Sequence, residues 1–257
     1  MTDNGIESGY RRWACPAPKA VFLLVHGLGA NTGRWESMAE FFLKRGIESY
    51  AVELARTDGF DGYFKNISRL QAAIKAERHS AKIFLIGESM GALISFLFVS
   101  SHPGLFSGLV CISPAFANRI RLSAFDQFKI ALSLIYNPRK MFTVPFDSSM
   151  CTRDTEYRKK MDADPSEHRT ASAKLLWQIL FYQAAARRVK NITSPVLFLT
   201  AGRDKISDNA PARAIFERLE AGDKELVEFP GMYHALTIDI GKEDVFKAVL
   251  DWTEERL

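Results

Sequence analysis

A G-x-S-x-G pattern places a serine where it could act as a nucleophile. The residues Gly87-Glu88-Ser89-Met90-Gly91 follow one apolar run and precede another. In enzymes with this pattern the serine occupies a sharp strand-to-helix turn, which raises its hydroxyl above a sheet. The residues two positions before and after the serine approach each other closely, so both must lack a side chain. The pattern therefore predicts Ser89 as the nucleophile of an acyl-transfer reaction.

A serine nucleophile needs a general base and an acid that orients this base. In enzymes with this serine motif, the acid and then a histidine follow the serine along the chain. His234 comes after the apolar run that ends at Phe229, and it alone among the 5 histidines follows the candidate acids. Asp204 comes at the end of an earlier apolar run, and Asp208 is its rival. We predict Asp204, which is nearer to the strand end, as the orienting acid and His234 as the base.

The segment His26-Gly27-Leu28-Gly29 could stabilise the charge that develops during acyl transfer. Such a reaction needs two N–H donors for the oxyanion. We predict the amide of Met90 as one donor, because it opens the helix after the nucleophile, where the helix dipole favours negative charge. The amide of Leu28 is the second, although an ordinary glycine-rich turn is the alternative. His26 ends a strand, so we expect it to have a structural hydrogen-bonding role.

Alternating strands and helices must position these groups. Continuous apolar runs predict strands that are buried on both faces, as in a parallel sheet, and apolar residues at helical spacing predict helices between them. The result is a mostly parallel central sheet flanked by helices, with the site at the carboxyl ends of the strands. The predicted strands are Ala20–His26, Glu48–Leu54, Ile83–Gly87, Leu109–Ser113, Pro195–Thr200 and Glu225–Phe229, and the predicted helices are Arg34–Arg45, Tyr63–Arg78, Gly91–Ser101, Ala210–Leu219 and Glu243–Glu255.

The alternation stops between Ala115 and Asn191, where we expect helices and no buried strand. This break predicts a helical cap, residues 116–191, inserted after the strand that follows the nucleophile helix. Residues 1–115 and 192–257 would then form the core beneath it.

Within the cap, apolar residues recur at helical spacing along one predicted helix. The spacing of Phe125, Phe128 and Leu132 gives one apolar face, and Phe146 follows it in the chain. We predict that these residues line an acyl-chain tunnel. The alternative is that they only pack against the main domain.

The first part of the cap is also basic. Residues 116–145 hold five basic residues and one acidic residue, a net charge of +4 that equals the net charge of the whole chain. Basic residues beside an apolar face are typical of helices that lie on anionic membranes, so we predict peripheral membrane contact through the cap. The alternative is a solvated charged surface on a helix that packs inward. The charged residues are Arg119, Arg121, Asp126, Lys129, Arg139 and Lys140.

The composition narrows the function classes. A net charge of +4 is too mild to indicate a nucleic-acid partner, and Cys15, Cys111 and Cys151 are too widely spaced for a disulfide framework or a zinc site. We expect no metal and no cofactor. The first residues lack the apolar segment of a signal peptide, and the chain has no apolar run long enough to span a membrane, so we expect a cytoplasmic location. The sequence does not determine the oligomeric state.

Over most of its length the chain resembles the monoacylglycerol lipase and lysophospholipase group of α/β-hydrolases, also called the serine aminopeptidase S33 or hydrolase-4 family. The resemblance implies the α/β-hydrolase fold, Ser89, Asp204 and His234 as the catalytic triad, and the Leu28 and Met90 amides as the oxyanion hole. It also implies hydrolysis of lipid-like esters. The residues that carry it are HGLGANTGRW at 26–35, GESMG at 87–91, TRDTEYRKKMDADPSEHRTASAKLL at 152–176, SPVLFLTAGRD at 194–204 and FPGMYHAL at 229–236.

Two local features refine this resemblance. Relatives often carry D-x-x-G-H-G-x-S after the second strand, whereas residues 53–60 here read ELARTDGF. That segment shapes a loop and supplies no catalytic group, so the difference concerns the subfamily. The GESMG elbow counts against a proline-specific peptidase, whose elbow tends to read GGSWG.

The sequence thus predicts a hydrolase of carboxylic esters, with a monoacylglycerol or lysophospholipid as substrate and an acyl-enzyme as intermediate. A short-chain carboxylesterase, a thioesterase or another α/β-hydrolase chemistry is the alternative, because this fold hosts many reactions. A non-catalytic ligand-binding homologue is a further alternative, although such proteins commonly lose a member of the triad and this chain has all three.

Overall fold

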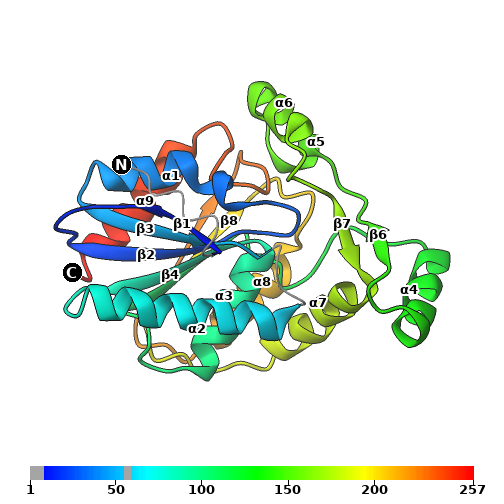
Figure 1. The fold of residues 1–257 in the computed structure, drawn as a ribbon, viewed down its shortest axis with the longest axis horizontal. Helices are drawn as coiled ribbons and strands as arrows, with labels where there is room; N and C mark the ends of the chain where they lie inside the picture. Colours follow the sequence, from blue (N-terminus) through cyan, green and yellow to red (C-terminus); the bar gives the residue numbers. More distant parts are fainter. Residues whose placement is uncertain (1–8, 55–58) are drawn as a thin grey trace.

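A single twisted sheet organises the molecule (Figure 1). The computed structural model describes residues 9–54 and 59–257. The strands of the sheet are β1 (Tyr10–Trp13), β2 (Ala20–Val25), β3 (Ile47–Val52), β4 (Ile83–Glu88), β5 (Gly108–Ile112), β8 (Val196–Ala201) and β9 (Lys224–Phe229). In the described part of the chain they form a sheet of 7 strands in the order β1-β3-β2-β4-β5-β8-β9. All neighbours are parallel except β1, which pairs antiparallel with β3.

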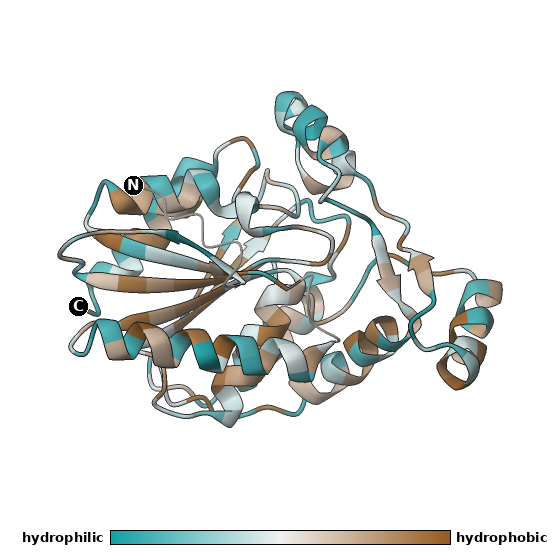
Figure 2. Cartoon of the chain, in the orientation of Figure 1, coloured by the Kyte–Doolittle hydropathy of each residue, from teal (hydrophilic) through white to brown (hydrophobic). Residues whose placement is uncertain are grey.

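Side chains of the central strands pack on both faces of the sheet, and Figure 2 shows these strands as largely hydrophobic. In β2, Val21 and Val25 belong to the core on one face, and Ala20 and Leu24 belong to the core on the other. All of them are fully buried. This burial on both faces explains why the strand reads as a continuous apolar run rather than as an alternating pattern.

Helices cover both faces and confirm the predicted fold class. On one face lie α1 (Glu36–Leu43) and α9 (Lys242–Glu254), and on the other lie α2 (Phe60–Glu77), α3 (Met90–Ser101) and α8 (Asn209–Arg218). The helix predicted at Arg34–Arg45 differs at its start, because Thr32–Trp35 forms a 3-10 turn, η2, before α1 begins.

The elements between β5 and β8 lie beyond the carboxyl ends of the parallel strands (Figure 1). They are α4 (Ala124–Tyr136), β6 (Met141–Thr143), α5 (Ser148–Cys151), α6 (Thr155–Ala163), β7 (Thr170–Ser172) and α7 (Ala173–Ala186). All of them fall within residues 116–191, the predicted cap. We expected no buried strand here, and β6 and β7 form only a short antiparallel pair with mostly accessible residues.

The antiparallel strand β1 was not predicted, because its residues YRRW form no apolar run. The loop at 53–60, where the sequence departs from its relatives, falls partly outside the described residues. No helix among the described residues is long and apolar enough to cross a membrane.

Candidate active site

Ser89 lies at a sharp turn between β4 and α3. Its backbone has φ 58° and ψ −119°, in a region that L residues rarely adopt. The turn is fixed by hydrogen bonds on both sides, since the Ser89 N–H donates to the carbonyl of Ile112 at 2.9 Å and the Ser89 carbonyl accepts from the N–H of Ala92 at 3.0 Å. The strained conformation therefore holds the serine at the carboxyl end of the sheet.

The glycines around Ser89 allow this turn. A Cβ atom added to Gly87 would lie 2.3 Å from the carbonyl oxygen of Gly91. A Cβ atom added to Gly91 would lie 2.0 Å from the carbonyl oxygen of Val25 in the neighbouring strand β2. Both positions are thus restricted to glycine by close backbone contacts, as the sequence pattern predicts.

The structure brings Ser89, His234 and Asp204 together in one hydrogen-bond chain. The Nε2 atom of His234 lies 2.8 Å from Ser89 Oγ, and its Nδ1 atom lies 2.8 Å from Asp204 Oδ2. The other oxygen of Asp204 accepts the backbone N–H groups of Ile206 and Ser207, both at 2.8 Å. A carboxylate held in this way accepts the Nδ1 proton of His234 and leaves Nε2 free to accept the serine proton.

The rival residues have other contacts. Asp208 caps α8 by accepting the backbone N–H of Ala210. His26 contacts the carbonyl of Gly27 through Nδ1 and accepts the backbone N–H of Leu54 through Nε2. Asp208 therefore stabilises a helix end and His26 stabilises the loop after β2.

The surroundings of His234 change its basicity. Burial alone would lower its pKa, but the charge and hydrogen bond of Asp204, assisted by the charge of Glu88, outweigh burial and raise the pKa above the ordinary value of 6.5. A raised pKa makes the imidazole a stronger proton acceptor toward Ser89.

The loop that carries His234 is anchored on two sides. On the core side, Glu88 is buried and accepts the N–H and the hydroxyl of Thr237, at 3.2 and 2.9 Å. On the side of the predicted cap, Asp239 accepts the N–H of Tyr233 at 2.8 Å and the N–H of Arg153 at 2.7 Å. The position of His234 thus depends on both the elbow and the segment around Arg153.

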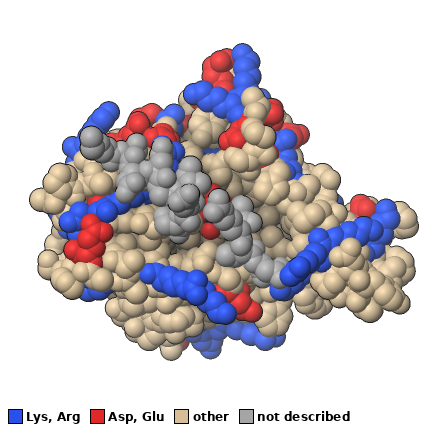
Figure 3. All heavy atoms as spheres, viewed as in Figure 1, with Lys and Arg blue, Asp and Glu red and all other residues tan. Residues whose placement is uncertain are grey.

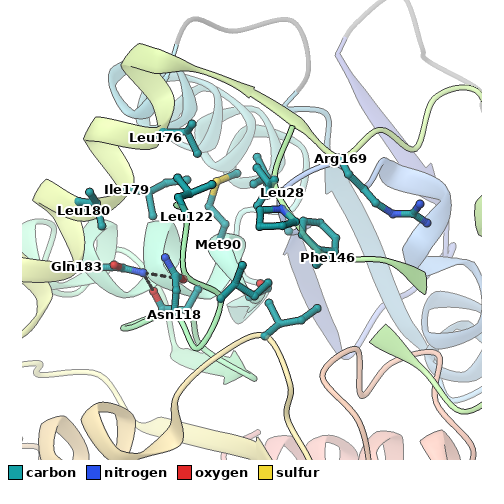
Figure 4. Close-up of a pocket in the computed structure, with 18 of the residues that line it drawn as sticks. Leu28, Met90, Asn118, Leu122, Phe146, Arg169, Leu176, Ile179, Leu180 and Gln183 are labelled. Carbon is teal, nitrogen blue, oxygen red and sulfur yellow. Dashed lines mark hydrogen bonds between the residues drawn. The ribbon is translucent and has the colours of Figure 1, made fainter. Parts of the chain in front are cut away.

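The predicted oxyanion donors lie beside the nucleophile. Leu28 and Met90 both line the same cavity as Ser89, and Figure 4 shows them next to each other. The loop before Leu28 lies against the serine, because a Cβ atom added to Gly27 would lie 3.1 Å from Ser89 Cβ. Met90 is the first residue of α3, where backbone N–H groups have no partner within the helix.

A cavity of about 820 Å³ opens above Ser89 and His234. In Figure 4, Leu176, Ile179 and Leu180 of α7 lie on one side of it, and Phe146 lies on the other. The wall also has a polar part, where Gln183 donates to Asn118 at 3.1 Å and to the carbonyl of Ala115 at 2.9 Å.

The four predicted tunnel residues divide into two pairs. Phe128 and Phe146 line the cavity. Phe125 and Leu132 are not among its lining residues, and they are 65% and 45% exposed. The side chains of α7 that do line the cavity were missed, although their spacing at 176, 179, 180 and 183 is a helical face that the sequence displays.

Comparison with known proteins identifies the family. Residues 16–241 match the family model described as Serine aminopeptidase, S33. The chain belongs to this family. The chain is 26% identical to human monoglyceride lipase, over 93% of this chain and 84% of that protein. It is also 25% identical to phospholipase YtpA of Bacillus subtilis, over 95% of this chain and 98% of that protein.

Solved structures agree with the S33 assignment. The crystal structure of Paleococcus ferrophilus monoacylglycerol lipase superposes with a TM-score of 0.87 at 25% identity, covering 96% of this chain and 98% of that chain. A monoglyceride lipase variant from Saccharomyces cerevisiae superposes with a TM-score of 0.82 at 19% identity, over 96% of this chain and 91% of that chain, which shows the shared fold.

Proposed function

We propose that this protein is a serine hydrolase that cleaves carboxylic esters of monoacylglycerols or lysophospholipids through an acyl-enzyme. One observation carries the proposal: an unbroken hydrogen-bond chain from Asp204 through His234 to the Ser89 hydroxyl, at the wall of a largely apolar cavity. Relatives named monoglyceride lipase and phospholipase support lipid esters as the substrate class.

In the first half of the reaction, Ser89 Oγ bonds to the acyl carbon while its proton passes to Nε2 of His234. The carbonyl electron pair moves to the oxygen, which the amides of Leu28 and Met90 stabilise. The bond to the alcohol then breaks, and the alcohol leaves with the proton from His234. Asp204 stays ionised throughout and stabilises the imidazolium.

In the second half, water replaces the alcohol. His234 takes a proton from the water as its oxygen bonds to the acyl carbon. Collapse of the second tetrahedral intermediate breaks the ester bond to Ser89, and the proton returns to the Ser89 oxygen. The products are a fatty acid and the free enzyme.

The cavity wall supports a substrate with an acyl chain. Leu122, Ile179 and Leu180 line it together with Phe128 and Phe146. Each methylene group that such a wall buries contributes about 0.8 kcal/mol to binding. A long acyl chain therefore gains more binding free energy from this cavity than the acetyl group of a short ester. A thioester with the same acyl chain would gain an equal amount. The acyl chain, rather than the leaving group, therefore dominates binding.

A fluorophosphonate probe tests the proposal directly. It should label the wild-type protein at Ser89, and Ser89→Ala should abolish both labelling and the hydrolysis of p-nitrophenyl esters while the protein stays folded. Ser101→Ala, at the exposed end of the same helix, is the matched control and should keep full activity. Activity of Ser89→Ala within about tenfold of wild type would refute the nucleophile assignment.

We also propose that the cap contacts the lipid surface. On α4, Phe125 and Ile135 are 65% and 75% exposed and do not line the cavity, so these side chains do not pack inward. Figure 3 shows an uncharged surface at the α4 end of the molecule with Lys and Arg beside it. Lys129 and Lys140 belong to the basic residues of this region. An exposed apolar face next to basic residues supports docking on an anionic bilayer.

Vesicle co-sedimentation tests this contact. Binding should require anionic lipid and weaken from low to high salt, because the screening length shortens. Arg139→Glu with Lys140→Glu should reduce binding without changing the turnover of a water-soluble ester. Arg69→Glu with Lys75→Glu on α2 makes the same charge change away from the cap and should bind normally. Equal binding of all three proteins would contradict docking through the cap.

A further inference from the structure

The glycine-rich loop that carries Leu28 lies between the nucleophile and the cap. On one side, a Cβ atom added to Gly27 would lie 3.1 Å from Ser89 Cβ. On the other side, Gly29 has φ +75°, and a Cβ atom there would lie 2.0 Å from the carbonyl oxygen of His168 in the cap. The N–H of His168 also donates to the carbonyl of Gly29 at 3.0 Å. The position of this loop relative to Ser89 therefore depends on the cap.

Side chains extend the same contact along the loop. Arg34 Nη2 lies 2.6 and 2.7 Å from the two carboxylate oxygens of Glu167, and Arg34 Nε lies 3.2 Å from one of them. The Arg34 and Glu167 side chains are only 7% and 11% exposed. Asn31 Nδ2 donates to Ser166 Oγ at 2.7 Å and to Asp164 Oδ2 at 3.1 Å. Cap residues 164–168 thus hold loop residues 29–34 at three places.

We propose that this cap segment completes the oxyanion hole, with Glu167 as a positioning residue that acts through Arg34 on the amide of Leu28. The inference rests on the proposed function, because it assumes that the Leu28 amide stabilises the oxyanion. A donor must lie at hydrogen-bond distance from the developing charge, and small displacements of catalytic groups are costly. The cap is therefore part of the catalytic machinery as well as a wall of the cavity.

The buried ion pair is the strongest of these contacts. A guanidinium at 7% exposure needs its counter-charge, so the core loop and the cap cannot separate at this point without leaving Arg34 uncompensated. The pair between Lys159 and Glu156 on α6 offers a contrast. It lies within the cap, neither residue lines the cavity, and both side chains are 74% exposed. Loss of that pair leaves no buried charge uncompensated.

The test compares Glu167→Gln with Glu156→Gln as the matched control. For Glu167→Gln we expect kcat to fall by about 10- to 100-fold with little change in KM, because the lost interaction acts on the transition state. A short trifluoromethyl ketone gives a second readout, since Ser89 adds to it and creates the same oxyanion. Its affinity should fall by the same factor as kcat. Glu156→Gln should match wild type in both measurements.

A milder variant covers the case in which Glu167→Gln is unstable. Ser166→Ala removes the hydrogen bonds of the Ser166 hydroxyl with Asn31 and Asp164 but keeps the bond from Asn31 to Asp164. We therefore expect a smaller loss in kcat and in ketone affinity. Wild-type kcat and ketone affinity in folded Glu167→Gln and in Ser166→Ala would overturn the inference, as would a change confined to KM. Such results would leave the proposed function intact if Ser89→Ala is inactive, whereas an active Ser89→Ala would refute both.

Discussion

Replacing Asp239 should destabilise the junction between the cap and the loop of His234. The Asp239 side chain is buried and accepts four hydrogen bonds. They come from the N–H of Tyr233 at 2.8 Å, the N–H and Nε of Arg153 at 2.7 and 2.9 Å, and the hydroxyl of Thr152 at 2.9 Å. An Asp239→Asn variant keeps the size of the side chain but turns one acceptor atom into a donor. Two of the four donors then face an N–H group.

The magnitude follows from these contacts. Losing a hydrogen bond to a charged group costs about 1.5–3 kcal/mol when the groups are buried. Arg153 is half-buried and can turn to water, so its side-chain bond contributes little to this cost. We therefore expect Asp239→Asn to lower the free energy of unfolding by about 2 kcal/mol and Asp239→Ala by about 3 kcal/mol. For a chain of this size, 3 kcal/mol corresponds to a Tm lower by about 6–12 °C.

Denaturant and thermal unfolding followed by circular dichroism measure this change. Asp251→Asn is the control, because Asp251 forms an exposed pair with Lys247 on α9 and should change the free energy of unfolding by less than about 0.5 kcal/mol. The free energy of unfolding measured at low pH is a second check on the role of Asp239. Burial would raise the pKa of Asp239, but its hydrogen bonds from Tyr233, Arg153 and Thr152 lower it below 3.8. Its stabilisation is thus present above pH 3.8 and disappears as the pH falls through the lower, folded-state pKa. If Asp239→Asn and Asp251→Asn unfold alike, the reasoning is wrong.

Three further predictions concern the site. The value of kcat/KM should rise with pH through the pKa of His234, which lies above 6.5. Glu88→Gln should move the midpoint of this rise to lower pH, because the charge of Glu88 raises the pKa of His234, and an unchanged midpoint would contradict His234 as the general base. On monoacylglycerols, kcat/KM should rise from acetyl to long acyl chains, and a steady fall beyond about four carbons would indicate a short-ester esterase. Gly91→Ala should lower the free energy of unfolding by at least about 3 kcal/mol, because the added Cβ would lie 2.0 Å from the carbonyl oxygen of Val25. Gly222→Ala is the control in the same denaturation assay and should match wild type, because no atom lies within 4 Å of a Cβ added there.

The fold class and the meeting of Ser89, Asp204 and His234 could be predicted because each residue follows a parallel strand of the sheet. Strands β4 and β8 are fully buried, whereas β9 is only partly buried. Parallel strands deliver their carboxyl ends to one edge, so position along the chain becomes position in space. The antiparallel strand β1 could not be predicted in the same way. It lies at the sheet edge, and the two arginines in Tyr10–Trp13 leave no apolar run to detect.

The contacts of residues 116–191 could be predicted less well, because they depend on how this segment docks. Phe125 and Leu132 share a helical face with Phe128, but only Phe128 of these three lines the cavity. Helical spacing defines a face and does not say what that face contacts. The contact between Arg34 and Glu167 joins residues 133 positions apart, and no local pattern marks either residue as its partner.

The conformation of Ser89 has a consequence for engineering. A residue held at φ 58° stores about 1–3 kcal/mol of backbone strain that glycine would relieve. Ser89→Gly should therefore unfold at a higher temperature than the wild-type protein, although it cannot form an acyl-enzyme. A library selected for heat resistance alone would be enriched in inactive proteins at this position. Selection for a thermostable catalyst must accordingly assay turnover in every round, because at the elbow stability and activity favour different residues.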